Sequence, residues 1–298
     1  MTDGGGLTAA TVSARLGLDW DLMPAEVSAL GGGMNSQTWL VEAGDRRFVA
    51  KAVPADRRAT FAAGLACATI VEAAGVEAGA PIRTRHDATT VAVDGSALAV
   101  LRFVDGAELT GEPVEERTLI GSTLGRVHLA LAGRRVAGTG RYPWIDPGAS
   151  HLSVRPWVRP AVEAALATWR AIPPGSLTWG LLHTDPAPEA FRLDPGTGTC
   201  GLIDWDLGTV APLLYDLASA EMYVGGPERS GPLIDAYLAT GALSTEEVQR
   251  ALRPMAAQRG AVQADYFAKR IATNDLTGID DANGNEEGLE DARRMLSA

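Results

Sequence analysis

The hydrophobic pattern of this 298-residue chain changes its period at one polar segment, and that change limits the folds open to it. Before the segment D-G-A-E-L-T-G-E-P, residues 105–113, apolar residues form short alternating runs, as in residues 27–53 and 91–104. After it, apolar residues recur with helical spacing. Alternation is typical of strands, and a 3.6-residue period is typical of amphipathic helices. The pattern predicts a β-rich region, a linker bearing Gly and Pro, and a larger helical region.

Turn and capping residues divide the two regions further. The first is expected to hold a short helix, a three-strand meander, a second helix and a hairpin, at 8–16, 27–53, 57–74 and 91–104. The second is expected to hold helices at 115–131, 159–172, 213–223, 246–270 and 286–296, with short β-like runs between 177 and 206. The predicted fold class is α+β, with residues 1–104 as a small β-rich N-lobe and 105–298 as a mainly helical C-lobe.

The composition excludes several function classes. A formal net charge of -11 argues against broad nucleic-acid binding, which needs clustered Lys and Arg. Two cysteines are too few for a disulfide framework or a zinc site and indicate a reducing compartment. The N-terminus lacks the features of a signal peptide, and no apolar run approaches the length of about eighteen residues that a membrane span needs. We expect a cytoplasmic monomer or homodimer without nucleic-acid or membrane partners.

Two features of the first region are compatible with phosphate binding. The glycine triplet Gly31–Gly33 could fold over phosphate oxygens, but it lacks the Gly-Lys-Ser/Thr ending of a P-loop and also fits a plain hairpin turn. Lys51, in F-V-A-K-A-V, shares a strand face with Val49 and Val53. On a buried face its ammonium needs a strong partner such as phosphate, whereas at a sheet edge it could extend into solvent.

Two acidic motifs mark the second region. Residues 183–191, H-T-D-P-A-P-E-A-F, follow one apolar run, and residues 203–206, I-D-W-D, close another. Carboxylates at adjacent strand ends, here Asp185 and Asp204, can share Mg²⁺, which typically binds one or two carboxylates plus substrate phosphates. A carboxylate can also orient a hydroxyl and accept its proton. A turn or helix-cap role stays open, above all for Asp206.

The order of these motifs resembles that of the aminoglycoside phosphotransferase and choline/fructosamine kinase group, within the protein-kinase-like fold. The family's H-G-D-x-x-x-x-N loop and I-D-[WF]-[DEG] motif correspond here to H-T-D-P-A-P-E-A and I-D-W-D. Its D-P-x-x-Y-D-L-A segment corresponds to A-P-L-L-Y-D-L-A, and residues 121–131 resemble the helix after its inter-lobe hinge. The resemblance covers about residues 25–225 and implies a two-lobe kinase that uses ATP and Mg²⁺.

The resemblance implies a role for each matching residue. Asp185 would orient the acceptor hydroxyl and take its proton, Asp204 would chelate Mg²⁺, and Lys51 would hold the α- and β-phosphates. His183 would be a structural member of the loop, and Asp216 would brace it. The remaining implied residues are the turn over the phosphates (Gly31, Gly32, Gly33, Asn35, Ser36), the adenine-binding hinge (Leu101, Phe103) and a supporting acid in the metal motif (Asp206).

One departure from the family pattern concerns the second metal ligand. The family's Asn, five residues after the catalytic Asp, is replaced here by Ala190, and the residue before it is Glu189. We hypothesise that Glu189 replaces the Asn as a metal ligand. The alternative is an exposed loop acid.

A second departure concerns the partner of the strand lysine. Kinases of this fold usually pair that lysine with a helix glutamate, but Gly64 and Ala66 stand where the acid is expected. The prediction therefore leaves two partners open for Lys51, Asp204 and Glu42.

The predicted function is ATP-dependent transfer of the γ-phosphoryl group to a hydroxyl of a sugar, amino sugar or aminoglycoside-like antibiotic, with antibiotic resistance as an associated role. The alternative is a catalytically weak nucleotide-binding scaffold. Because the C-terminal helices of this family wall the acceptor pocket, acids near the end of the sequence could attract an amine-bearing acceptor. A solvated, capped helix start is the other interpretation of these acids: Asp280, Asp281, Glu286 and Glu287.

Overall fold

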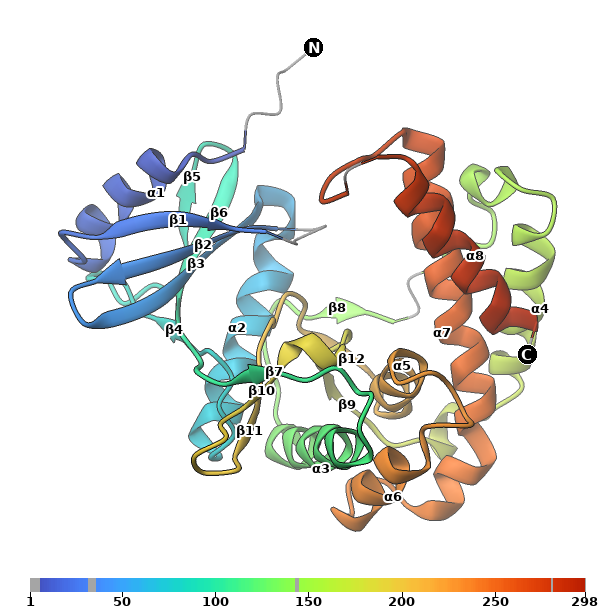
Figure 1. The fold of residues 1–298 in the computed structure, drawn as a ribbon. Helices are drawn as coiled ribbons and strands as arrows, with labels where there is room; N and C mark the ends of the chain where they lie inside the picture. Colours follow the sequence, from blue (N-terminus) through green and yellow to red (C-terminus); the bar gives the residue numbers. More distant parts are fainter. Residues whose placement is uncertain (1–5, 32–35, 143–144, 280, 298) are drawn as a thin grey trace. The chain divides into compact units, whose positions relative to one another are not determined.

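The computed structural model describes residues 6–31, 36–142, 145–279 and 281–297, which form two compact units (Figure 1). Unit 1 contains residues 1–107, 135–140 and 192–208, and unit 2 contains residues 108–134, 141–191 and 209–298. The segment that carries I-D-W-D thus belongs to the first unit, whereas the sequence pattern grouped it with the helical region. Whether 1–104 and 105–298 are units of folding stays a prediction.

Unit 1 is built on an antiparallel sheet in the order β1-β2-β3-β6-β4, with β5 also paired to β6. Its strands and helices are α1 (Ala9–Arg15), β1 (Glu26–Leu30), β2 (Gln37–Ala43), β3 (Arg46–Pro54), α2 (Arg58–Ala73), β4 (Pro81–Ile82), β5 (Val91–Val93) and β6 (Ser96–Arg102). A three-stranded sheet, β11-β10-β7, joins β7 (Ala107–Glu108), β10 (Phe191–Leu193) and β11 (Cys200–Leu202). The predicted meander, hairpin and two helices are all present.

Both faces of the main sheet are covered, because its strands are apolar on both sides. Ala50 and Ala52 of β3 pack into a core with Val12 and Leu16 of α1 and the chain after it. The other face packs into a second core that includes Val53 of β3 together with side chains of α2. Since successive side chains of a strand alternate, Lys51 lies on the α2 face with Val53.

Unit 2 is mainly helical. Its helices are α3 (Val114–Leu131), α4 (Val158–Arg170), α5 (Leu214–Tyr223), α6 (Gly231–Ala239), α7 (Thr245–Thr273) and α8 (Asn283–Ser297). One core joins α4, α7 and α8, and α3 packs against α6 (Figure 1). Strand β12 (Thr209–Pro212) lies in the middle of a three-stranded sheet. It pairs with β9 (Trp179–Leu182) along one edge and with β8 (Gly140–Arg141) along the other. The sequence analysis did not predict α6 or β12.

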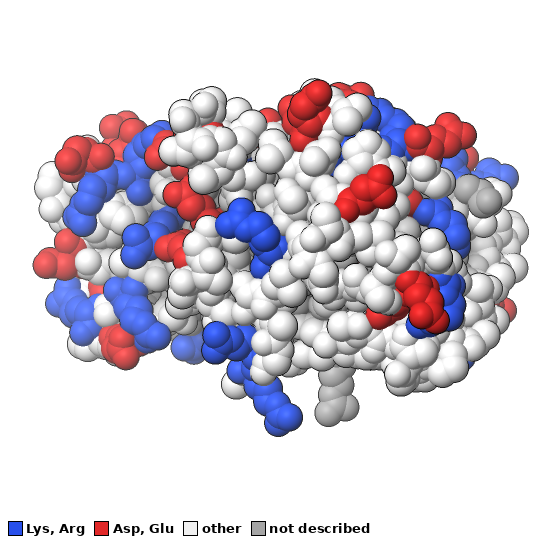
Figure 2. Space-filling view, turned by 90° about the horizontal axis from the view of Figure 1, so that it is seen from below, with Lys and Arg blue, Asp and Glu red and all other residues white. Residues whose placement is uncertain are grey.

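The surface carries charges of both signs. On the face seen in Figure 2, Lys and Arg side chains are interspersed with Asp and Glu. A wide area between these charged side chains consists of other residues. In the described ranges, the helices all fall short of the length and apolar character that a membrane crossing needs.

Candidate active site

The first group of candidate residues lies within unit 1, around Lys51. This residue is in β3, opposite Thr38 of β2 and Ala99 of β6, and only 5% of it is exposed. Its Nζ forms ion pairs with the carboxylates of both Asp204 and Asp206. A buried strand lysine and the I-D-W-D motif, far apart in sequence, therefore form one charged cluster.

The sequence left Asp204 and Glu42 open as partners of Lys51, and the structure pairs Lys51 with Asp204 and also with Asp206. Glu42 lies opposite Arg47 in the β2–β3 register, about 13 Å along the strand from Lys51. Burial alone would lower the pKa of Lys51, but the negative charges of Asp206 and Asp204 outweigh it and raise that pKa. Lys51 is therefore charged in the folded protein.

Helix α2 approaches the acidic loop closely, because it has a glycine at the contact. A Cβ added to Gly64 would lie 2.6 Å from the carbonyl oxygen of Trp205. Nearby, the N–H of Gly208 donates to the carbonyl of Thr60 at 3.0 Å. A side chain at position 64 would clash with this backbone, so the family's helix acid has no room there. In this chain Asp206 supplies the second carboxylate on the lysine.

The loop after β11 is anchored so that its carboxylates stay accessible. The indole Nε1–H of buried Trp205 donates to the carbonyl of Leu202 at 2.8 Å, and the N–H of Leu202 donates to the carbonyl of Glu77 at 2.8 Å. Asp204 adopts φ 72°, a left-handed conformation that Asp tolerates better than most residues. The side chains of Asp204 and Asp206 are 56% and 27% exposed.

The two carboxylates fit a magnesium ion. They already converge on one cation, the Nζ of Lys51, and their oxygens are the donor type that Mg²⁺ prefers. Within the described parts of the chain there is no cluster of three or more His, Cys, Asp or Glu that could hold a metal alone. Asp204 and Asp206 offer the oxygen donors that Mg²⁺ takes, and their role as its ligands stays a prediction.

The second group of candidate residues lies within unit 2, around Asp185. Asp185 follows β9, and its side chain is 65% exposed. Its Oδ1 accepts a hydrogen bond from the Oη of Tyr223 at 2.5 Å, and the Nη2 of Arg259 lies 3.8 Å from the same oxygen. Burial raises the pKa of Tyr223 far above its usual value, and the charge of Asp185 raises it further, so Tyr223 remains a donor.

The backbone before Asp185 is held by Asp216 at the start of α5. The Oδ2 of Asp216 accepts from the N–H of His183, and its Oδ1 accepts from the N–H of Thr184, both at 2.8 Å. Asp216 also lies 3.1 Å from Nε2 of His128, whose Nδ1 is 2.7 Å from the Oη of Tyr237. Asp216 is fully buried, and its hydrogen bonds are those predicted for a brace. Its contribution to catalysis stays a prediction.

Thr184 has a strained conformation at this point. Its φ is 81°, a left-handed value that costs a non-glycine residue about 1–2 kcal/mol, and Thr is β-branched. The family motif has Gly here. The hydrogen bond from Thr184 to Asp216 helps to hold the residue in place.

The sequence analysis missed Tyr223 and Arg259. A signal for Tyr223 was present, because it follows Asp216 by seven residues in one helix and so lies on the same face. Arg259 gave no local signal, since it lies inside the long helix α7, more than 70 residues after Asp185. His183, predicted to be structural, is 1% exposed.

Several predicted residues of the nucleotide site are not placed by the structure. Outside the described ranges lie Gly32, Gly33 and Asn35 of the phosphate turn, and also Asp280 of the predicted acceptor pocket. Gly31 directly follows β1, and Ser36 directly precedes β2. The role of this turn in phosphate binding stays a prediction.

The predicted hinge lies at the end of β6. Leu101 is in the strand, and Phe103 follows it with the guanidinium of Arg47 4.2 Å from its ring centre. Between them, the N–H of Arg102 donates to the carbonyl of Ala80 at 3.0 Å. Adenine contacts from this segment stay a prediction.

Glu189 lies in the 3-10 turn Pro188–Ala190 and is exposed. Its charge is among those that raise the pKa of Tyr223. Its role as a second metal ligand stays a prediction.

The described acids near the end of the sequence have local partners. Glu286 forms an ion pair with Arg155 at 2.6 Å, and Glu287 accepts from the Nδ2 of Asn283 at 2.6 Å. Asp281 accepts from the backbone N–H of Asn283 at 2.8 Å, at the start of α8. These contacts match the capped helix start that was the other interpretation, and a role in acceptor binding stays a prediction.

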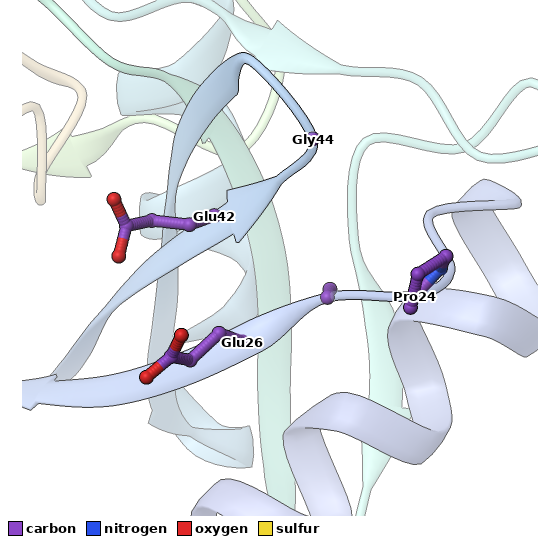
Figure 3. Close-up of a pocket in the computed structure, with 5 residues that line it drawn as sticks. Pro24, Glu26, Glu42 and Gly44 are labelled. Atoms are coloured by element: carbon purple, nitrogen blue, oxygen red, sulfur yellow. The ribbon is translucent and has the colours of Figure 1, made fainter.

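A shallow cavity of about 510 Å³ lies on unit 1 where β1 begins and β2 ends (Figure 3). Glu26 and Glu42, directly opposite each other in the register, line it together with Pro24, Ala25 and Gly44. It belongs to neither candidate group.

The sheet-based unit and the mainly helical unit agree with the protein-kinase-like fold predicted from the sequence. A sequence model of the phosphotransferase enzyme family matches residues 26–255. The chain belongs to this family, which confirms the class predicted from its motifs.

Curated relatives of the chain are homoserine kinases. The protein of Nitrobacter winogradskyi is 26% identical over 197 residues, which are 61% of this chain and 60% of the relative. That of Rhodospirillum rubrum is 30% identical over 148 residues, 46% of this chain and 45% of the relative. The chain thus spans 60% or less of the length of these relatives in the alignments.

Solved structures share the fold over nearly the whole chain. An amicoumacin kinase in complex with AMP-PNP and Ca²⁺ has a TM-score of 0.75 at 13% identity, covering 98% of this chain and 94% of that one. A choline/ethanolamine kinase family protein from Mesorhizobium loti has a TM-score of 0.69 at 17% identity, covering 96% and 94%. Spectinomycin phosphotransferase in complex with ADP and spectinomycin has a TM-score of 0.64 at 11% identity, covering 98% of both chains. The predicted fold class is confirmed.

Proposed function

We propose that this protein transfers the γ-phosphoryl group of ATP to a hydroxyl of a small molecule. The observation that carries the proposal is the cluster of buried Lys51 with Asp204 and Asp206, which combines a cation for phosphate oxygens with two carboxylates for a metal. Family membership supports the reaction class. Two of the similar structures are complexes with AMP-PNP and with ADP, which supports a nucleotide donor.

Each side chain has a separate task in this proposal. Lys51 holds the α- and β-phosphate oxygens, and Asp204 and Asp206 hold Mg²⁺. Mg²⁺, when bound, neutralises charge on the phosphates. Asp185 orients the acceptor hydroxyl and takes its proton, while Asp216 keeps the loop of Asp185 in place. Most of the rate enhancement then comes from positioning and charge neutralisation.

The acceptor is a small polar molecule with a free hydroxyl. Sugars, amino sugars and aminoglycoside-like antibiotics are candidates, and the homoserine kinase relatives add a hydroxylated amino acid. A panel of homoserine, choline, amino sugars and spectinomycin separates these classes.

The test combines nucleotide binding with turnover. MgATP should raise the melting temperature, and one acceptor of the panel should produce ADP. Asp185→Ala should abolish turnover but leave nucleotide binding intact, and Asp204→Ala should abolish both activity and its metal dependence. Asp194→Ala is the matched control, because Asp194 is an acid bonded locally to Gly196 and Thr197.

Two outcomes contradict the proposal. Stabilisation by MgATP without ADP formation on any acceptor favours a nucleotide-binding scaffold. Retained turnover in Asp185→Ala excludes the mechanism. If Glu189→Ala leaves the Mg²⁺ dependence unchanged, Glu189 is not the replacement for the family's Asn.

A further inference from the structure

The carboxylate of Asp185 is held through one of its two oxygens. The hydrogen bond from Tyr223, at 2.5 Å, and the guanidinium nitrogen of Arg259, at 3.8 Å, both reach Oδ1. Among the residues that the structure describes, none makes a polar contact with Oδ2. We propose that Tyr223 and Arg259 are positioning residues that fix this carboxylate and reserve Oδ2 for the acceptor hydroxyl. This inference rests on the proposed function.

Asp185 is the carboxylate that pairs with the buried guanidinium of Arg259. Arg259 is 7% exposed inside α7, where its Nε donates to Ser219 at 3.1 Å and its Nη1 donates to Gln263 at 3.0 Å. Both of these partners are neutral, and Asp185 is the carboxylate within ion-pair distance. Burying a guanidinium is costly, and an apolar side chain of similar volume often stabilises a fold equally well. The buried charge is therefore explained by its neighbour rather than by packing.

Two tyrosine rings hold the guanidinium in place. The guanidinium carbon of Arg259 lies 6.0 Å from the ring centres of both Tyr215 and Tyr223. Burial alone would lower the pKa of Arg259, but its interactions with Tyr215, Tyr223 and Asp185 raise that pKa, so the side chain stays a cation. Of the two tyrosines, Tyr223 is the one whose hydroxyl donates to Asp185.

Tyr223 belongs to the same helix as the brace of the loop. In α5, Asp216 accepts from the backbone of His183 and Thr184, and seven residues later Tyr223 donates to the side chain of Asp185. One helix thus fixes both the backbone before Asp185 and the rotation of the Asp185 carboxylate.

In the proposed reaction the two carboxylate oxygens of Asp185 have different roles: Oδ1 is held by the protein, and Oδ2 accepts the proton. As the acceptor oxygen attacks the γ-phosphorus, its O–H bond breaks and the proton moves to Oδ2 of Asp185. The bond between the γ-phosphorus and the bridging oxygen breaks, and its electron pair leaves with ADP. The hydrogen bond from Tyr223 and the ion pair with Arg259, both on Oδ1, keep Oδ2 in the direction of the hydroxyl, which is the geometry that general-base catalysis requires.

Turnover of conservative variants tests the role. Tyr223→Phe should lower kcat at least about tenfold while the KM for ATP changes less than about threefold, the pattern of a lost transition-state interaction. The matched control, Tyr266→Phe, removes a tyrosine hydroxyl of α7 that accepts from Arg270 at 3.4 Å, and it should change kcat less than about twofold. Arg259→Lys should retain more turnover than Arg259→Gln, because it keeps the charge. Equal kcat values for Tyr223→Phe and Tyr266→Phe overturn the proposal.

A second measurement does not depend on activity. The melting-temperature shifts of Tyr223→Phe and Asp185→Asn should be non-additive in the double variant, since directly bonded residues couple. Additive shifts refute the positioning role of Tyr223, whether or not the variants retain turnover. If no acceptor gives turnover but the shifts are non-additive, the proposed function is refuted. The contact by which Tyr223 positions Asp185 is then still supported.

Discussion

The close contact between α2 and the acidic loop predicts that Gly64→Ala destabilises the protein, although helix propensity alone predicts the opposite sign. Replacing a helical Gly by Ala stabilises a helix by about 1 kcal/mol. Here the new Cβ would lie 2.6 Å from the oxygen and 3.1 Å from the carbon of the Trp205 carbonyl, and 3.2 Å from the N of Leu207. These are backbone atoms, which cannot rotate away, and overpacking of this kind costs about 1–3 kcal/mol. We expect a net destabilisation of up to about 2 kcal/mol.

The substitution should also displace the carboxylates of the loop from Lys51, and so raise the KM for ATP. Urea unfolding and steady-state kinetics measure the two effects. Gly175→Ala is the control, because a Cβ at Gly175 meets no atom within 4 Å, and its stability should change by less than about 0.5 kcal/mol. A Gly64→Ala protein that is more stable than the wild type would refute the reasoning.

Three other perturbations have defined outcomes. Thr184→Gly should leave stability unchanged or raise it by up to about 1 kcal/mol in urea unfolding, since it relieves the left-handed strain, whereas a loss above about 1 kcal/mol contradicts that strain. Asp216→Asn should cost about 2 kcal/mol or more and lower kcat, because it removes the charge that accepts two buried N–H groups; unchanged stability and kcat exclude the brace. Burial raises the pKa of the Cys67 thiol from 9.0 to about 12. The contribution of the neutral thiol to the free energy of unfolding should therefore be fully present below about pH 9. It should fall as the pH rises towards about 12, by up to about 1.4 kcal/mol per pH unit. Cys67→Ala should flatten that fall in urea unfolding measured against pH, and an unchanged slope removes Cys67 as its source.

Local patterns in the sequence were sufficient for most of the fold. Alternation placed Lys51 and Val53 on one face of β3, and the glycine at residue 75 marked the end of α2 within two residues of Ala73. Helix α6 was missed because it is short and begins with Gly and Pro, which interrupt the helical period.

The site was less predictable, because its decisive contacts are not local. Two acids in I-D-W-D were equally placed to reach Lys51, and only packing shows that both do. The proximity of Arg259 to Asp185 depends on how α7 packs beside α5, and no local period encodes that. The sequence showed only that Gly64 stands where the family has an acid. The structure explains the glycine, because the backbone of the acidic loop lies too close to α2 for a side chain at this position.

The division of the chain into units also limits how it can be cut. The chain passes from one unit to the other at five places, so that Lys51 and its two carboxylates share a unit although residues 108–134 and 141–191 between them do not. A fragment of residues 1–104 would carry the lysine without Asp204 or Asp206 and would leave a buried charge uncompensated. Splitting or circular permutation at the polar segment 105–113 would therefore separate groups that have to fold together, and the lobes of this protein are not exchangeable parts.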